Sequence, residues 1–152
     1  EMQKKEKTII GRAEKVLFPA LGIAPHARID TGAKTSSIGI KSATETSSGL
    51  EVVFFDGVTR HLFRHYDRVV ISSSMGHQQV RYKVRLTVEI KSRRILTSFT
   101  LANRDSQVYP LLIGRNTLFK KFIVDVEGGN ILKDAEKERS RQLQSQTSEV
   151  HI

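Results

Sequence analysis

The sequence predicts an all-β domain, a closed or partly open barrel of many short strands with at most a little helix. Three observations favour this class. Side chains in residues 82–90 alternate between apolar and polar, which is the period of a strand with one buried face. Asp56-Gly57 lies between two apolar runs and is a strong signal for a two-residue hairpin. Other short apolar runs are separated by segments rich in Gly, Ser and Asp, which are turn residues.

The first part of the chain predicts three strands. Residues 1–7 are a polar lead-in, and residues 8–18 predict a strand in which Gly11 suits a bulge or a bend. A turn at residues 19–22 leads to a second strand, which ends at Asp30. Residues 36–40 predict a third strand. The polar residues 42–49 are expected to form a loop.

The rest of the chain predicts paired strands and then a short helix. The Asp56-Gly57 hairpin joins residues 50–55 to 58–63, and a second hairpin joins residues 69–71 to 80–84 through a flexible tip at 72–77. Residues 95–101 are the expected partner of 82–90, and residues 103–107 are a loop. A short helix is expected to begin in the motif Gly114-Arg115-Asn116, followed by a last strand at 122–126. The charged, Gln-rich residues 133–152 predict a loose helix or disordered tail, which leaves residues 8–132 as the folded domain.

Composition limits the classes of function. A chain of 152 residues with 25 Lys and Arg against 16 Asp and Glu carries a net charge of +9, which favours acidic partners. Charge alone is equally compatible with a basic surface that has no specific acidic ligand. With no Cys, disulfides, thiol nucleophiles and cysteine-bound zinc are excluded. No apolar run is long enough for a membrane span. Because the chain begins at Glu1, removal of an upstream signal peptide stays an open alternative.

Two motifs far apart in the chain carry the chemistry. The strand that ends at Asp30 continues into Thr31 and Gly32, and Gly32 allows a tight loop that presents the carboxylate to a cleft. The second motif is Leu112-Ile113-Gly114-Arg115-Asn116. In this order, flanking a β-rich middle, Ile29-Asp30-Thr31-Gly32-Ala33 and the second motif resemble the paired signatures of retropepsins, the single-domain aspartic proteases of retroviruses. The barrel predicted above is therefore expected to be of the retropepsin type.

A closer resemblance is to a bacterial family of retropepsin-like proteins once catalogued as ATP-dependent zinc proteases. Its pattern matches residues 10–12, 17–21, 30–37, 76–82, 101–106 and 111–118, within a span of roughly 8–126. The old name is not supported, because the chain has neither a Gly-x-x-x-x-Gly-Lys-Ser/Thr phosphate loop nor a His-Glu-x-x-His motif. His61 and His65 are i, i+4 neighbours on an expected strand, for which a structural or solvent role is favoured over a metal site. No metal or cofactor is expected, and the bacterial cytoplasm and periplasm both stay open as compartments.

The resemblance implies an aspartic peptidase that hydrolyses peptides with a water molecule activated by paired carboxylates. Asp30 would be catalytic, and since the chain holds one Asp-Thr-Gly, the second carboxylate would be Asp30 of another copy in a homodimer. Residues that support the catalytic loop would be Thr31, Gly32, Ala33, Ile113, Gly114 and Arg115. Retroviral enzymes pair this arginine with an acid after the Asp-Thr-Gly-Ala motif. Here that position is Lys34, so Asp105 or Asp125 is the expected replacement partner of Arg115.

The same resemblance implies a flap at residues 69–83 that closes over a bound polypeptide. Residues expected to bind substrate are Lys34, Ser73, Ser74, Met75, Gly76, Arg81 and Arg104. Because the bacterial family occurs in the company of ATP-grasp ligases that add glutamates to proteins, and because the chain is basic, glutamate-rich peptides or tails are the suggested substrate. One alternative is a catalytically silent peptide-binding module of the same fold. A nucleic-acid-binding barrel is disfavoured, because aromatic residues are only 7% of the chain and Trp is absent.

Overall fold

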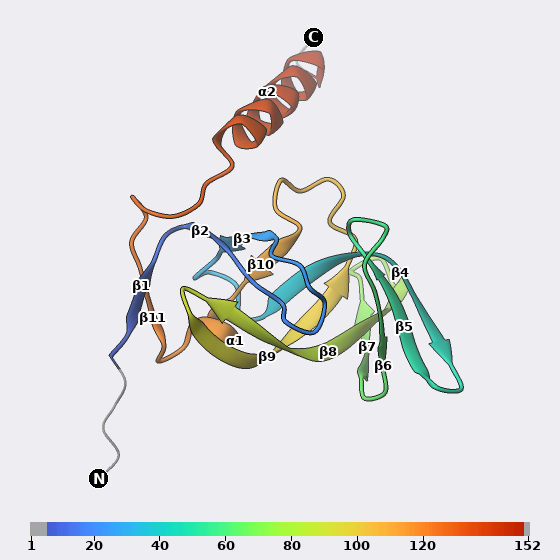
Figure 1. Ribbon diagram of the computed structural model, residues 1–152. Coiled ribbons are helices and arrows are strands. Elements are labelled where there is room, and N and C mark those ends of the chain that lie inside the picture. Colours follow the sequence, from blue (N-terminus) through green and yellow to red (C-terminus); the bar gives the residue numbers. More distant parts are fainter. Residues whose placement is uncertain (1–5, 151–152) are drawn as a thin grey trace.

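The computed structural model describes residues 6–150, the last four of them by their backbone alone, so most of the lead-in and the end of the tail lie outside the described residues. The strands form one large branched sheet and one small sheet (Figure 1). In spatial order the large sheet contains β2 (Ala13–Lys15), β3 (His26–Ile29), β10 (Leu111–Ile113), β4 (Ser36–Thr46), β9 (Arg93–Ala102), β8 (Gln78–Ile90) and β7 (Asp67–Ser72), with β5 (Gly49–Phe54) and β6 (Arg60–Phe63) branching from β4. The small sheet pairs β1 (Thr8–Ile10) with β11 (Phe122–Val124), and the helices are α1 (Arg115–Leu118) and α2 (Lys133–Val150).

The mostly β class is confirmed, but of the two expected forms, a closed or a partly open barrel, the closed one is not found. The strand path runs from β2 to β7 without returning on itself within the described part of the chain. One isolated bridge brings the segment after β2 toward β8, through Leu17 N–H to Glu89 O at 3.0 Å and Glu89 N–H to Leu17 O at 2.8 Å. Pairing stops there because Phe18 turns back, donating its N–H to Ile23 O.

The two predicted hairpins are confirmed as β5–β6 and β7–β8, and the predicted pairing of residues 82–90 with 95–101 is confirmed as β8–β9. Gly57 has φ 73° at the turn between β5 and β6, a left-handed conformation that favours glycine. Lys91 and Ser92, with φ 49° and 66°, form the turn between β8 and β9, as expected of a two-residue hairpin loop. The alternation predicted in residues 82–90 is also confirmed, because Val84, Leu86, Val88 and Ile90 are buried along β8.

Two expected elements differ from the structure. The polar residues 42–49 are not a loop, because β4 continues to Thr46 after a bulge between Ile40 and Ser42 and pairs with β5. Backbone pairing with an apolar neighbour outweighs the polar composition of this segment. The strand expected at 8–18 is divided into β1 and β2 at Gly11, where the backbone lies against Gly128 and Gly129.

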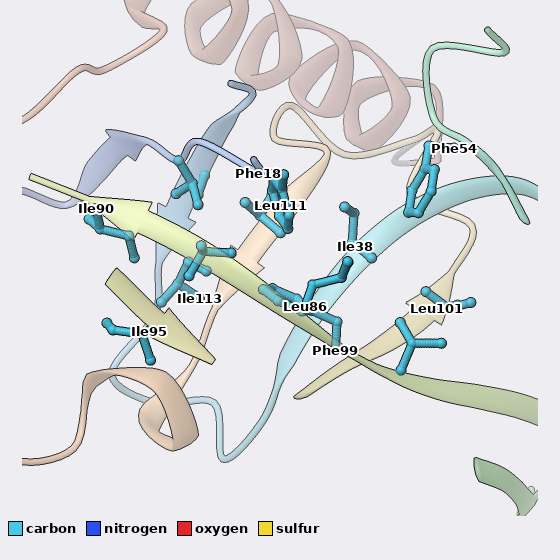
Figure 2. Close-up of a cluster of buried hydrophobic side chains, with 14 of the residues drawn as sticks. Phe18, Ile38, Phe54, Leu86, Ile90, Ile95, Phe99, Leu101, Leu111 and Ile113 are labelled. Carbon is cyan, nitrogen blue, oxygen red and sulfur yellow. The ribbon is translucent and has the colours of Figure 1, made fainter. Parts of the chain in front are cut away.

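The core is a cluster of buried side chains of the large sheet and its connections, several of them from β8 and β9 (Figure 2). Phe18 and Phe99 meet there with ring centroids 5.5 Å apart. The labelled side chains in Figure 2 come from segments spread over the whole sequence, namely Phe18, Ile38, Phe54, Leu86, Ile90, Ile95, Phe99, Leu101, Leu111 and Ile113. Burial of this apolar area is the main source of stability for the sheet that presents the Asp30 loop.

A buried carboxylate attaches the chain before α2 to the start of the sheet. Glu14 is only 2% exposed and accepts hydrogen bonds from Gly11 N–H at 2.7 Å and Asn130 Nδ2 at 3.1 Å. Asn130 N–H also donates to Ala13 O at 2.7 Å. The segment expected to be a loose helix or a disordered tail is a continuous helix from Lys133 to Val150. Over the described residues, no helix is long and apolar enough to cross a membrane.

Gly11→Ala is expected to lower the free energy of unfolding by about 2 kcal/mol, as overpacking in tight contacts does. A Cβ atom at this position would lie 2.0 Å from Gly128 O and 2.3 Å from Gly129 Cα. Both are backbone atoms, which cannot move aside without displacing the chain. Chemical denaturation measures the change. The control is Gly22→Ala, where nothing lies within 4 Å and only the strain at φ +67° is added. A loss at Gly11 no greater than at Gly22 would contradict the close approach.

Candidate active site

Asp30 lies at the end of β3, where the strand gives way to a tight loop. β3 runs parallel to β10 with Ile29 opposite Ile113, and the Asp30 N–H donates to Ile113 O at 2.8 Å. The half-buried Asp30 side chain accepts the Gly32 N–H on Oδ1 at 2.9 Å. This leaves the other carboxylate oxygen without a bond inside the loop. The two sequence motifs therefore meet at the predicted catalytic residue.

The second motif supports the loop from below through Gly114. A Cβ atom on Gly114 would lie 2.3 Å from Thr35 O and 2.9 Å from Ala33 O, so only glycine allows this approach. The next residue, Arg115, donates its N–H to Ala33 O at 2.8 Å. The expected proximity of Ala33, Ile113 and Gly114 to the Asp30 loop is thus observed.

Arg115 binds the loop through backbone carbonyls, and among the described residues no carboxylate lies within 4.0 Å of it. Its Nη1 donates to Thr31 O at 3.1 Å and to Gly32 O at 3.0 Å. The expectation that Asp105 or Asp125 replaces the missing acid is wrong. Asp105 pairs with Lys41 at 3.0 Å, and Asp125 accepts the N–H of Glu127. Two backbone carbonyl oxygens therefore accept the hydrogen bonds of the Arg115 guanidinium group.

Sequence reasoning missed a hydroxyl network beneath the loop. The fully buried Ser36 hydroxyl accepts Gly114 N–H at 3.0 Å and donates to Asn116 Oδ1 at 2.8 Å. It also lies 2.8 Å from the hydroxyl of Thr117, which in turn lies 2.9 Å from that of Thr97. Asn116 Nδ2 extends the network to Ser98 O at 3.0 Å. Ser36 and Asn116 lie inside the matched motifs, but nothing in the spacing of the two residues indicated that their side chains connect the motifs.

A basic pocket opens beside Asp30 on the side of β2 and β3. This cavity of about 510 Å³ is lined on the sheet side by Arg12, Arg28, Arg104 and Tyr109, and on the other side by α2. Arg104 Nε donates to Tyr109 O at 3.1 Å. The pKa of Arg104 is lowered, mainly by burial and then by the charge of Arg28, while the nearby charge of Asp30 opposes the shift.

Glu136 of α2 reaches into this pocket. Its carboxylate accepts two hydrogen bonds from Arg12, each of 3.0 Å, and one from the Tyr109 hydroxyl. The hydrogen bonds from Arg12 lower the pKa of Glu136, and those from Tyr109 and the charge of Arg28 act in the same direction. Of the residues that line this pocket, only Arg104 was predicted from the sequence to bind substrate. Arg28 could also have been predicted, because residues two positions apart on a strand point to the same face, and Asp30 follows Arg28 by two positions.

The other predicted substrate residues lie in different places. Lys34 is exposed on the Asp30 loop, where its carbonyl accepts the Asn116 N–H. The hairpin tip with Ser73, Ser74, Met75 and Gly76 is fully exposed. Within residues 6–146, no hydrogen bond or ion pair joins this tip to the Asp30 loop.

The base of the β7–β8 hairpin is held more firmly than its tip. Glu45 on β4 accepts hydrogen bonds from the hydroxyls of Tyr66 and Tyr82 and pairs with Arg68. Arg81 is opposite Val69 in the β7–β8 pair, next to Tyr82, and lines a separate pocket with Lys41 and other residues of β4 and β9. Arg104 therefore lines the pocket that contains Ile29, and Arg81 lines another.

An apolar surface also borders the Asp30 loop. Phe119 is 67% exposed directly after α1, and it lines a shallow pocket together with Thr31, Arg115 and apolar residues of β11.

At the remote pair of histidines, His61 lies edge-on to Phe63 with ring centroids 4.6 Å apart. Within residues 6–146, no three His, Asp or Glu side chains are grouped closely enough to hold a metal ion.

A sequence profile described as RimB-like, for the retropepsin-like aspartic endopeptidase RimB, matches residues 9–134. The chain belongs to this family. The resemblance inferred from the two motifs is therefore confirmed, and the profile extends into the first turn of α2, which carries no motif of its own.

Several curated relatives of this RimB-like chain carry another name, probable α-L-glutamate ligase. The relative from Desulfotalea psychrophila is 33% identical over 130 residues, and that from Shewanella pealeana is 35% identical over 130 residues. Each match covers 78% of this chain and 28% of the relative. The chain thus spans less than a third of the length of these ligases.

The solved structures support the fold. The crystal structure of Lpg0085, a protein of unknown function from Legionella pneumophila, matches with a TM-score of 0.57 and 22% identity. The match covers 82% of this chain and 97% of that one. At this identity the likeness concerns the fold alone, and it covers almost the whole of the Legionella protein.

Ser36→Ala is expected to lower the free energy of unfolding by about 1–3 kcal/mol, because it leaves the buried Gly114 N–H without an acceptor. Thermal or chemical unfolding of the RimB-like chain measures this. Ser37→Ala is the matched control, one position along β4 and half-buried, for which about 0.5 kcal/mol or less is expected. Equal losses in the two variants would show that the hydroxyl network does not support the loop.

Proposed function

We propose that this RimB-like chain is an aspartic endopeptidase or peptide-trimming hydrolase that works as a homodimer. The observation that carries the proposal is the position of Asp30 at a strand end, fixed by hydrogen bonds to Ile113 and Gly32. Both halves of the family's paired signature contribute to this arrangement. One carboxylate oxygen is engaged inside the loop, and the other is available to a water molecule.

The proposal requires a second carboxylate, which a second copy would supply. Within the printed sequence, Asp-Thr-Gly occurs only at residues 30–32. Asp30 of each copy would then approach across a twofold axis. The exposed Phe119 beside Thr31 and Arg115 supports this, because it offers apolar surface next to the loop that would lie on that axis.

The reaction would be direct hydrolysis of a peptide bond. Two adjacent carboxylates cannot both ionise easily, so they share one proton. The ionised Asp30 takes a proton from water as the water oxygen bonds to the carbonyl carbon, and the protonated Asp30 donates to the carbonyl oxygen. The C–N bond of the resulting tetrahedral species then breaks, with proton transfer to the leaving nitrogen. The products are a carboxylic acid and an amine, and no cofactor is consumed.

Acidic peptides, and glutamate-rich ones in particular, are the proposed substrates. Lys34 on the catalytic loop and Arg104 beside Asp30 would attract carboxylates, within a chain of net charge +9. The relatives named as probable α-L-glutamate ligases support the same class, since joining glutamates makes acidic peptides. The ligation itself is not proposed for this chain, because the matched segment is only 28% of each ligase.

Asp30→Asn is expected to reduce peptide hydrolysis by a factor of about 10² to 10⁴, because it removes the group that accepts the proton of water. The rate is measured on a glutamate-rich peptide by chromatography of the products. Asp105→Asn is the control, an exposed aspartate whose carboxylate pairs with Lys41. Adding excess Asp30→Asn chains to the unmodified protein should also reduce its rate through mixed dimers.

An Asp30→Asn protein that hydrolyses peptides as fast as Asp105→Asn would overturn the aspartic mechanism. Absence of hydrolysis by the unmodified chain, with tight binding of the same peptide, would favour the silent peptide-binding module instead.

Phe119→Asp is expected to shift the protein toward monomers and to lower the specific activity in proportion, because it puts a charge into the proposed apolar interface. Sedimentation over a range of concentrations measures the dimer fraction. The control is Val58→Asp, since Val58 is 78% exposed in the β5–β6 turn. A fully active monomer, or dimers unaffected by Phe119→Asp, would contradict the proposed interface.

A further inference from the structure

The first turn of α2 is fixed against the sheet by a series of contacts that ends in the basic pocket. Gly128 O accepts the Arg12 N–H at 3.2 Å, and Asn130 binds Ala13 O and the buried Glu14. Leu132 N–H then donates to the Tyr109 hydroxyl at 3.1 Å. These contacts determine where the helix begins, and they direct Glu136 toward Arg12.

The pocket holds more positive charge than Glu136 neutralises. Arg12, Arg28 and Arg104 line it from the sheet and Arg139 from α2, against the single carboxylate of Glu136. Among the described residues, Arg28 and Arg104 have no carboxylate within 4.0 Å, unlike Arg12. Guanidinium groups bind carboxylates through two parallel hydrogen bonds, which is how Arg12 binds Glu136.

The pocket is also next to the proposed catalytic group. Ile29 and Arg28, the two residues before Asp30, are among its lining residues. Arg12 O accepts the Ile29 N–H at 2.9 Å, so the backbone that carries Arg12 is hydrogen-bonded to the strand that carries Asp30. Arg104 lines the same pocket as Arg28 and Ile29, and its Nε donates to Tyr109 O at 3.1 Å.

We propose that this pocket is a subsite for an acidic side chain of the substrate, and that Glu136 occupies it as an internal competitor. The inference rests on the proposed function, since it assumes that Asp30 and the pocket act on one peptide. An incoming glutamate would take over the hydrogen bonds of Arg12 and Tyr109 and would gain the unpaired charges of Arg28 and Arg104. The first turn of α2 would leave the pocket as the peptide enters.

Glu136 could instead serve only to attach α2 to the sheet, with the same contacts but with a different effect on peptide binding. Replacing Glu136 would then weaken the attachment of α2 without changing the affinity for an acidic peptide. Competition predicts a gain in affinity for the acidic peptide instead, because Glu136 no longer fills the pocket in a fraction of the molecules.

The test measures binding in a chain that cannot hydrolyse the probe, the full-length Asp30→Asn variant. The probe is a fluorescently labelled hexaglutamate peptide, with hexaglutamine as the uncharged control. Adding Glu136→Gln should tighten hexaglutamate binding about threefold to tenfold, the range that release of one partly exposed ion pair allows. The matched control is Glu138→Gln on the same helix, whose carboxylate pairs with Arg141. It should leave the dissociation constant unchanged.

Arg28→Gln should weaken hexaglutamate binding by a similar factor without changing hexaglutamine binding. In the Asp30→Asn chain, hexaglutamate should also increase hydrogen exchange of the backbone amides in the first turns of α2. The inference is overturned if Glu136→Gln and Glu138→Gln bind hexaglutamate equally, or if Arg28→Gln has no effect.

These outcomes are independent of catalysis. Hydrolysis by the unmodified chain without any effect of Glu136→Gln would refute the subsite and keep the proposed peptidase. If the expected binding changes are found but the unmodified chain does not hydrolyse peptides, the subsite is kept and the proposed peptidase is refuted.

Discussion

The candidate site depends on the close contact between Gly114 and the backbone of the Asp30 loop. No larger residue allows the carbonyls of Ala33 and Thr35 to approach so closely. β10 ends at Ile113 and lies beside β3, so Gly114 follows at the point where both strands give way to the loop. Arg115 and Ser36 bind the hydrogen-bonding groups on either side of this contact. The position of the loop therefore depends on close packing of backbone against backbone, and the Gly32 N–H holds one oxygen of the Asp30 carboxylate.

Three different surfaces surround this loop, and their chemistry suits different tasks. A buried hydroxyl network below it joins β4, β9 and α1 to Gly114. An exposed apolar surface around Phe119 is suited to contact with another protein surface. The arginine pocket under α2 is suited to carboxylates. Three kinds of chemistry therefore surround one loop, with Thr31 and Arg115 shared between the loop and the apolar surface.

How far the sequence predicted this arrangement differs from element to element. Alternation predicted β8 because one face of that strand is buried along its length. The motifs predicted the Asp30 loop because tight turns restrict residue choice strongly. The segment at 42–49 was mispredicted because a strand held by backbone pairing needs no apolar pattern. The pairing of Arg12 with Glu136 spans 124 positions of sequence, so no local pattern could indicate it.

The pocket and the Asp30 loop share their backbone. Arg28 and Ile29 line the pocket directly before Asp30, and Arg12 O accepts the Ile29 N–H at 2.9 Å. The strand end that positions Asp30 therefore also positions Arg28, and its backbone is hydrogen-bonded to that of Arg12. A side chain bound to these arginines in the proposed subsite would for the same reason have a defined position relative to Asp30.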